Sequence, residues 1–293
     1  MLEKCLNCPR NCFVDKKLQN GFCGANNKIQ INKIMLHFWE EPIISGTDET
    51  SKKGSGAIFF SHCNLKCVYC QNYEISHGDF GDYYSTEQLA EVFKQLEASG
   101  AANINLVTPT HYSLQILEAL KSYKPKIPVV WNTGGFESPE IIKKLEGYVD
   151  IFLTDFKYHS DELAKKYSSA PNYFECCTKS LAEMKKICPQ NIIVDGLMQK
   201  GIIVRHLVLP NCTEDSKKVL EDIKSILGSD AIVSLMSQYI PVGEAKNFPE
   251  LNRKLKPIEY KIVKSYMYKL GLDGFVQELE SANKNYIPDF NTN

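Results

Sequence analysis

The stretch Cys63-Asn64-Leu65-Lys66-Cys67-Val68-Tyr69-Cys70 is the part of the chain around which the rest is organised. Its three cysteines have the spacing C-x3-C-x2-C and follow the apolar run 57–60, which predicts a short buried strand. Thiolates are soft ligands suited to iron–sulfur clusters or zinc, and one short loop can place three of them on one face of a cluster. The next cysteine is Cys176, so a four-iron cluster held here would keep one iron without a protein ligand. An open metal position is typical of a site built for chemistry.

A structural zinc site is the alternative that the same loop allows. Three cysteines with His77 would complete a Cys3His set, and such zinc sites are common. His62 is a poor fourth ligand, because its side chain leaves the strand directly next to Cys63. The spacing favours the open iron–sulfur cluster over this zinc site.

The motif C-x3-C-x-aromatic-C directly after a first strand resembles the signature of radical S-adenosylmethionine (SAM) enzymes. Within that superfamily, the chain looks most like the homologues of pyruvate formate-lyase activating enzyme, over about residues 56–238. The resemblance implies that Cys63, Cys67 and Cys70 are catalytic and bind a [4Fe–4S] cluster whose free iron chelates SAM. It also implies reductive cleavage of SAM to methionine and a 5'-deoxyadenosyl radical, chemistry that belongs to the cofactors. A reductant such as flavodoxin or ferredoxin would supply the electron.

A second set of cysteines lies near the N-terminus and consists of Cys5, Cys8, Cys12 and Cys23. Four cysteines that include one C-x2-C pair can close a tetrahedral zinc site or hold a second iron–sulfur cluster. Because the set is complete, either metal would be fully liganded, which indicates a structural or electron-relay role. A Cys-Pro-Arg-x-Cys segment of this kind occurs in some radical SAM relatives, and this supports a shared site without naming its metal.

Composition and charge are those of an ordinary globular protein, with 43% hydrophobic and 24% charged residues among 293. The formal net charge of −1 argues against a polyanion such as nucleic acid as an obligatory partner. No apolar run approaches the roughly 20 residues that cross a bilayer, and the N-terminus lacks the apolar core of a signal peptide. We therefore expect a cytoplasmic protein that binds neither nucleic acid nor membrane.

Short apolar runs alternate with amphipathic helical stretches from residue 57 onward, and Ser85 with Gln88 predicts the capping box that starts the first of these helices. The expected strands are 57–60, 104–108, 128–132, 149–157, 202–209 and 231–236. Such alternation predicts βαβ units and a parallel sheet. Six units fit the α/β fold of the resembled superfamily, a partial (β/α)6 TIM-like barrel, although the pattern also allows an open doubly wound sheet.

Residues 1–55 are expected to form a cysteine-rich extension and linker, with a small strand pair in 28–41. Residues 56–293 are expected to form the core with a C-terminal helix and tail.

Charged side chains end two of these strands, where α/β barrels gather their chemistry. In 149–157 the period of two places Asp155 and Lys157 on one face, where an unpaired charge is costly. They either pair with each other or serve a ligand, and the resembled family has an Asp-x-Lys here that contacts SAM. Arg205 interrupts another apolar strand, and its guanidinium suits either the methionine carboxylate or Asp155.

Four weaker assignments complete the expected SAM site, namely Tyr69, Gln238 and Asn132, with Thr108 at the end of the second strand. Tyr69 matches the family's aromatic residue whose backbone touches the adenine, and Gln238 ends the sixth strand, where the family often supports that base. Asn132 ends the third strand and is followed by Thr133, Gly134 and Gly135. The two glycines permit close approach of a ligand.

The chain departs from the family at Thr108, which ends the second strand. Thr-Pro-Thr-His stands there in place of the Gly-Gly-Glu that helps to bind the methionine ammonium. The substrate is therefore left open between a protein glycine, as in the activating enzymes, and another peptide or small molecule. A non-catalytic zinc-binding scaffold is the rival from another class.

Overall fold

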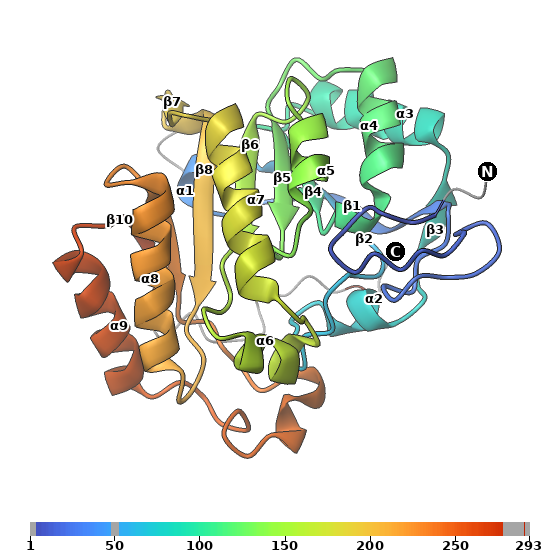
Figure 1. Ribbon diagram of the computed structural model, residues 1–293. Coiled ribbons are helices and arrows are strands. Elements are labelled where there is room, and N and C mark those ends of the chain that lie inside the picture. Colours follow the sequence, from blue (N-terminus) through green and yellow to red (C-terminus); the bar gives the residue numbers. More distant parts are fainter. Residues whose placement is uncertain (1–3, 48–52, 278–289, 291–293) are drawn as a thin grey trace.

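Figure 1 shows the computed structural model, which describes residues 4–47, 53–277 and 290. Within these residues one sheet has the strand order β10-β9-β8-β6-β5-β4-β2-β1-β3, with β7 paired to β8. The strands are β1 (Ile29–His37), β2 (Ser55–Phe60), β3 (Asp82–Tyr84), β4 (Ile104–Val107), β5 (Val129–Thr133), β6 (Ile151–Asp155), β7 (Ile192–Val194), β8 (Leu197–Leu207), β9 (Ile232–Met236) and β10 (Asp273–Val276).

Helices connect the parallel strands, because a parallel neighbour can be reached only by a crossover. They are α1 (Pro42–Ser45), α2 (Tyr73–His77), α3 (Thr86–Ala98), α4 (Ser113–Ser122), α5 (Pro139–Lys144), α6 (Asp161–Ser168), α7 (Tyr173–Ile187), α8 (Thr213–Leu227) and α9 (Pro257–Lys269), with short 3-10 turns η1 (Thr110–Tyr112) and η2 (Gly243–Asn247). Neighbouring strands from β2 through β4, β5, β6, β8 and β9 to β10 run parallel. Figure 1 shows α5, α7 and α8 in front of these strands.

Both faces of the sheet are apolar, because side chains alternate along each strand. Phe152 of β6 packs in the large core beneath the helices. Ile151 and Leu153 face the other side, where they meet Ile44 of α1 and Met198 of β8. The sheet is thus covered by helices outside and by α1 inside, which confirms the expected α/β fold with the mostly parallel sheet of a partial TIM-like barrel.

All six expected strands are present, and the expected capping box of α3 forms between Ser85 and Gln88. The expected strand pair in 28–41 is wrong, because β1 is one long strand that pairs antiparallel with both β2 and β3. Strand β10 was not expected, and its parallel pairing with β9 extends the sheet beyond six units.

The division of the chain at residues 55 and 56 stays a prediction. Residues 48–52 of the expected linker lie outside the described residues, and β2 already begins at Ser55. Among the described helices, none combines the length and the apolar character needed to span a membrane.

Candidate functional site

The cysteine loop begins directly after β2, at a residue with unusual backbone geometry. His62 has a φ of 73°, in the left-handed region that favours glycine, so the chain turns sharply before Cys63. The loop is then anchored from outside: Lys66 N–H donates to Ser168 O (3.0 Å) and Val68 N–H to Tyr167 O (2.9 Å). These bonds hold the loop against the end of α6.

Each of the three sulfurs in this loop accepts a hydrogen bond. The bonds run from Leu65 N–H to Cys63 Sγ (3.3 Å), from Ser168 Oγ to Cys67 Sγ (3.0 Å) and from Ser76 Oγ to Cys70 Sγ (3.3 Å). Donors aimed at sulfur suit a metal-bound thiolate and tune the potential of an iron–sulfur cluster. The donor set therefore fits a cluster bound by three cysteines.

Burial keeps the metal-free thiols protonated. Burial raises the pKa of Cys70 to about 11, and it also raises the pKa values of Cys63 and Cys67. A negative charge on Cys67 further raises the pKa values of Cys63 and Cys70. Metal binding must therefore release these protons. Among the described residues, no three His, Cys, Asp or Glu side chains converge closely enough to hold a single metal ion. A cubane spreads its cysteines over separate irons, so this finding does not exclude one.

Asp155 and Lys157 form an ion pair at the end of β6, and the pair lies beside the cysteine loop. Burial by itself would lower the pKa of the Lys157 ammonium. The negative charges of Asp155 and Cys67 outweigh this effect, so the pKa of Lys157 is raised. Lys157 in turn lowers the pKa of Cys67 against the effect of burial. The backbone here is also held, since Lys157 N–H donates to the Tyr173 hydroxyl (2.9 Å), which donates to Gly134 O (2.9 Å).

Arg205 on β8 binds two carboxylates that the sequence did not single out. Its Nε and one terminal nitrogen donate to Glu41 (2.7 and 2.6 Å), and that nitrogen also pairs with Glu40. The alternative pairing with Asp155 is wrong, although Asp155 still contributes to raising the pKa of Arg205. A role for Arg205 toward the methionine carboxylate stays a prediction, in which the ligand would compete with Glu40 and Glu41.

Asn132 belongs to this buried network. Its Oδ1 accepts from Arg205 (3.5 Å), and its amide donates to Glu40 (3.5 Å), which also accepts from Asn105 (2.9 Å). Asn105 Oδ1 is buried and has no hydrogen-bond partner among the described residues. The inner side of the sheet therefore carries a polar layer above the apolar layer around Ile44.

The remaining expected SAM-site residues lie around the loop. Thr108 has a φ of 59°, and its N–H donates to Asn132 O (2.8 Å). The Tyr69 ring is buried and its hydroxyl bonds that of Tyr158, so the ring itself packs in the core. Gln238 O accepts from Gln71 (3.1 Å), which ties the end of β9 to the residue after Cys70. Thr108 is thus bonded to Asn132 and Gln238 to the residue after the loop, and the roles of these residues toward SAM stay predictions.

Glu137 is a buried acid that sequence reasoning missed. Its carboxylate accepts hydrogen bonds from the hydroxyls of Thr110 and Thr133, while Oε2 has no hydrogen-bond partner among the described residues. Burial raises the pKa of Glu137 to about 7, and the two threonines only partly offset this effect. It stands in the Gly-Gly-Phe-Glu segment after β5, a pattern that could have drawn attention to it.

The N-terminal cysteines are also brought near one another. A Cβ on Gly21 would lie 3.6 Å from Cys12 Sγ and 3.7 Å from Cys23 Sγ, so both sulfurs flank one glycine. Burial raises the pKa of Cys8 to about 12, and the charges of Cys23 and Cys5 add to this shift. The four thiols occupy one small region, but among the described residues no three of them converge closely enough to hold a single metal ion, so the second metal stays a prediction.

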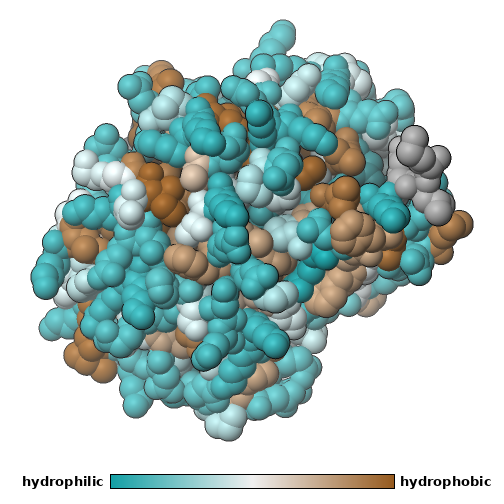
Figure 2. All heavy atoms as spheres, viewed as in Figure 1, coloured by the Kyte–Doolittle hydropathy of each residue, from teal (hydrophilic) through white to brown (hydrophobic). Residues whose placement is uncertain are grey.

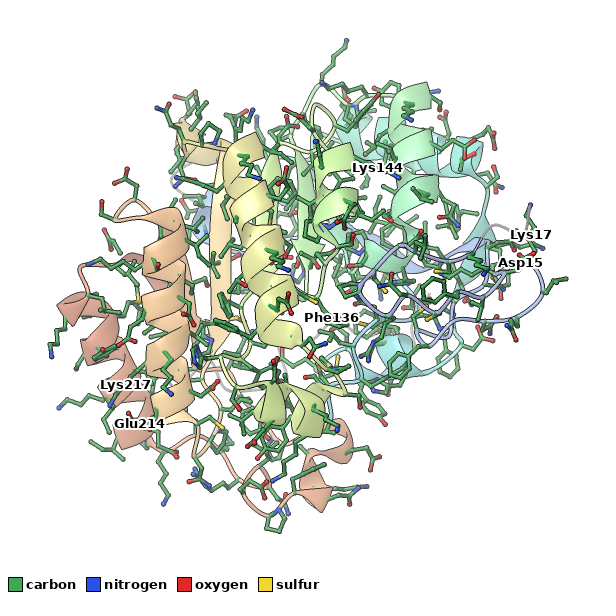
Figure 3. The ribbon with its side chains drawn as sticks, in the orientation of Figure 1. Asp15, Lys17, Phe136, Lys144, Glu214 and Lys217 are labelled. Carbon is green, nitrogen blue, oxygen red and sulfur yellow. The ribbon has the colours of Figure 1, made fainter. Side chains whose placement is uncertain are left out.

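The two cysteine sets meet through Arg10. Its Nε donates to Asn64 O in the cysteine loop (2.9 Å). The guanidinium lies 3.8 Å from the ring centre of Phe22 and 5.0 Å from that of Phe136, which Figure 3 places beside the N-terminal segment. Lys66 Nζ also donates to Cys23 O (3.5 Å). The N-terminal segment is therefore packed directly on the loop of the other set.

The sequence model of the radical SAM superfamily matches residues 57–223 of this chain. The chain belongs to the radical SAM superfamily. Its match covers the cysteine loop, Asp155, Lys157 and Arg205, and it begins after the four N-terminal cysteines. Membership implies a [4Fe–4S] cluster and SAM, and radical SAM enzymes catalyse radical reactions.

The chain is also similar to other proteins in sequence and in fold. An uncharacterized protein of Methanocaldococcus jannaschii is 31% identical over an alignment of 286 residues. The alignment covers 93% of this radical SAM chain and 77% of that protein. SuiB of Streptococcus suis, bound to precursor peptide SuiA, has a TM-score of 0.51 at 13% identity, with 75% of this chain and 48% of SuiB covered. The structure of SuiB bound to S-adenosylmethionine has a TM-score of 0.50 at 13% identity, and the match covers 75% of this chain and 49% of SuiB. The chain spans about half the length of SuiB, and this likeness shows the fold.

Proposed function

We propose that this protein is a radical SAM enzyme that abstracts a hydrogen atom from a protein or peptide substrate. Cys63, Cys67 and Cys70 would hold the [4Fe–4S] cluster. Bound there and reduced, the cluster would supply the one electron needed to cleave SAM to methionine, and the 5'-deoxyadenosyl group released would take the substrate hydrogen as 5'-deoxyadenosine. The supporting observation is a single loop whose three sulfurs each accept a hydrogen bond.

Asp155 and Lys157 are assigned to the amino acid end of SAM. The methionine part carries one ammonium and one carboxylate, and the ion pair offers the matching opposite charges beside Cys67. Binding would exchange the contact between Asp155 and Lys157 for contacts with SAM. The carboxylate of Asp155 thereby takes the part that the absent Gly-Gly-Glu motif plays in the activating enzymes.

A protein glycine is the substrate suggested by the resemblance to pyruvate formate-lyase activating enzyme. A peptide substrate is also in keeping with SuiB, which shares the fold and was solved with its precursor peptide. The four N-terminal cysteines are assigned a second metal, zinc or an iron–sulfur cluster, and a flavodoxin or ferredoxin is assigned as the electron donor. We place the protein in the cytoplasm, where thiols stay reduced.

The test is anaerobic reconstitution with iron and sulfide, followed by EPR of the reduced protein with and without SAM. About four irons per chain, with a signal that changes on adding SAM, support the cluster at Cys63, Cys67 and Cys70 and favour zinc in the N-terminal set. About eight irons assign clusters to both sets. Zinc in both sets with no response to SAM would overturn the proposal in favour of the zinc-binding scaffold.

A further inference from the structure

The N-terminal lobe, defined as residues 4–28, concentrates positive charge. It contains five basic residues and one acidic residue, whereas the whole chain has a formal net charge of −1. The basic residues are Lys4, Arg10, Lys16, Lys17 and Lys28. Arg10 and Lys16 point inward, since Lys16 Nζ donates to His111 O (2.9 Å). Lys4, Lys17 and Lys28 are exposed and give the lobe a cationic surface.

The same lobe exposes large apolar side chains. Their exposed fractions are 51% for Leu6, 58% for Phe13, 79% for Leu18 and 45% for Phe22. All four come from a segment of 17 residues, 6–22, that lies between Cys5 and Cys23. Figure 2 shows apolar and polar atoms interleaved over this part of the molecule. Apolar groups within a charged rim are typical of a surface that binds another protein.

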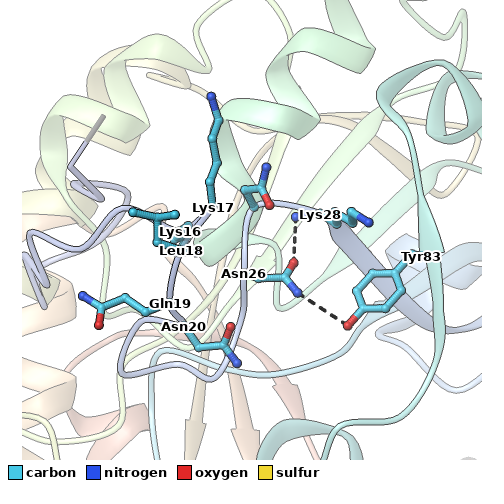
Figure 4. A pocket seen from close by; sticks show the side chains of 9 residues that line it. Lys16, Lys17, Leu18, Gln19, Asn20, Asn26, Lys28 and Tyr83 are labelled. Atoms are coloured by element: carbon cyan, nitrogen blue, oxygen red, sulfur yellow. Dashed lines mark hydrogen bonds between the residues drawn. The ribbon is translucent and has the colours of Figure 1, made fainter. Parts of the chain in front are cut away.

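A cavity of about 320 Å³ lies in this surface (Figure 4). Lys17 and Lys28 line it together with the amides of Gln19, Asn20, Asn26 and Asn27 and the Tyr83 ring. Asn26 orders one wall, because it accepts from Lys28 N–H (2.8 Å) and donates to the Tyr83 hydroxyl (3.5 Å). Ammonium and amide N–H groups donate hydrogen bonds, so the cavity suits carboxylate side chains.

The lobe is joined to the catalytic loop by direct contacts. Arg10 bonds Asn64 O, one residue from Cys63, and Lys66, one residue from Cys67, bonds Cys23 O. A protein docked on the lobe would thus sit beside the N-terminal cysteines and one bonded contact from the cluster loop. This adjacency holds whichever metal the four N-terminal cysteines bind.

We propose that the exposed face of the N-terminal lobe is the docking surface for an acidic one-electron donor protein of the flavodoxin or ferredoxin class. This inference rests on the proposed function, which needs one electron for each SAM cleaved. The donor is oxidised by one electron and the catalytic cluster is reduced by one. Cationic charge attracts the acidic donor, and Leu18 and Phe22 supply apolar contact once it has docked.

The test compares two double charge reversals in the reconstituted full-length protein. Lys17→Glu/Lys28→Glu changes the lobe face, and Lys261→Glu/Lys269→Glu changes exposed lysines of α9 by the same charge. The pairs are matched, because Lys28 lies 5.8 Å from the Tyr83 ring centre and Lys269 lies 5.8 Å from that of Tyr266. Anaerobic stopped-flow absorbance follows oxidation of flavodoxin hydroquinone, or of reduced ferredoxin, on mixing with each protein.

The lobe variant is expected to lower the second-order rate constant by about tenfold or more at low salt, and raising the ionic strength should shrink this difference. The α9 variant should change the rate less than about twofold. Dithionite, a small reductant, should support SAM cleavage equally in both variants, which separates docking from chemistry. Loss of cleavage with dithionite in the wild type would instead defeat the proposed function.

Three outcomes would overturn the docking proposal. In the first, the lobe variant is reduced as fast as the wild type, and in the second, the α9 variant loses as much rate as the lobe variant. In the third, neither flavodoxin nor ferredoxin reduces the wild type under conditions in which dithionite supports SAM cleavage. Leu18→Asp provides a further check, since it should slow reduction by the protein donors without changing cleavage with dithionite.

Discussion

Cys67 links the cysteine loop to two other parts of the fold. Its sulfur accepts from Ser168 at the end of α6, and its charge interacts with those of Asp155 and Lys157 at the end of β6. In the proposed function, Cys67 would connect the cluster to the groups assigned to SAM. Its removal should therefore affect both metal binding and chemistry.

Cys67→Ala should abolish reductive cleavage of SAM, because two cysteines cannot hold the cubane in the geometry that leaves one iron open. Cys176→Ala is the matched control, since Cys176 stands outside both sets and is also a free thiol. Iron content and 5'-deoxyadenosine formation with dithionite are measured for both variants. Cleavage retained by Cys67→Ala would contradict the assignment of the cluster.

Glu137 makes stability depend on pH in a predictable direction. Its pKa is about 7 in the folded protein against an ordinary value of 4.5, so the folded state binds the extra proton between these values. The contribution of Glu137 to stability is therefore fully present below its ordinary pKa and is lost as pH rises from about 4.5 through about 7. The full effect is on the order of 3 kcal/mol.

Glu137→Gln should remove this contribution, because an amide has no proton to lose in that range. Thermal unfolding of the wild type and the variant between pH 4.5 and 8 measures the difference. The wild type should lose stability relative to the variant as the pH rises. Parallel pH profiles for the two proteins would show that the buried carboxyl does not titrate in this window.

At the scale of elements, Arg205 and Glu41 join β8 to the segment that leads into α1. The two charges lie on the inner side of the sheet, and both side chains are mostly buried. Paired buried charges add little net stability, but removal of one partner leaves the other uncompensated. The pair therefore fixes where α1 sits against the sheet.

Glu41→Gln should lower the free energy of unfolding by about 2 kcal/mol, because Arg205 loses one of its two buried carboxylates and keeps Glu40. Glu175→Gln is the control, because it breaks an exposed ion pair with Lys179 on α7 and should leave the unfolding midpoint unchanged. Urea unfolding under anaerobic conditions measures both variants. Equal effects of the two substitutions would argue that the inner pair is no more important than a surface pair.

At the scale of the whole molecule, Arg10 connects the N-terminal lobe to the barrel. Its hydrogen bond to Asn64 O and its stacking between Phe22 and Phe136 join segments far apart in the chain. Stacked guanidinium groups of this kind contribute on the order of 1 kcal/mol or more. The lobe should therefore loosen when the guanidinium is removed.

Arg10→Gln should speed amide hydrogen exchange in residues 4–28 while exchange in β4, β5 and β6 stays slow. Lys4→Gln is the control, because Lys4 contacts Phe13 within the lobe and not the barrel. Exchange followed by mass spectrometry resolves the two regions. Unchanged lobe exchange in Arg10→Gln would show that other contacts hold the lobe in place.

Local pattern in the sequence determined much of this protein. The alternation of apolar runs and amphipathic helices predicted the six parallel strands, and Ser85 with Gln88 predicted the start of α3. The C-x3-C-x2-C loop identified the superfamily, because three ligands for one cluster lie within eight residues. These features are visible in the sequence since the residues that create them are close together along the chain.

Tertiary structure alone decided which distant groups meet. Arg205 and Glu41 are 164 residues apart, and Arg10 and Asn64 are 54 apart, so no local period links them. The long β1 and the added β10 likewise depend on partners elsewhere in the sheet. Such pairings arise because folding buries charges and strand edges, and a buried charge or backbone group is costly unless it is paired. The partner is whichever complementary group the completed fold places beside it.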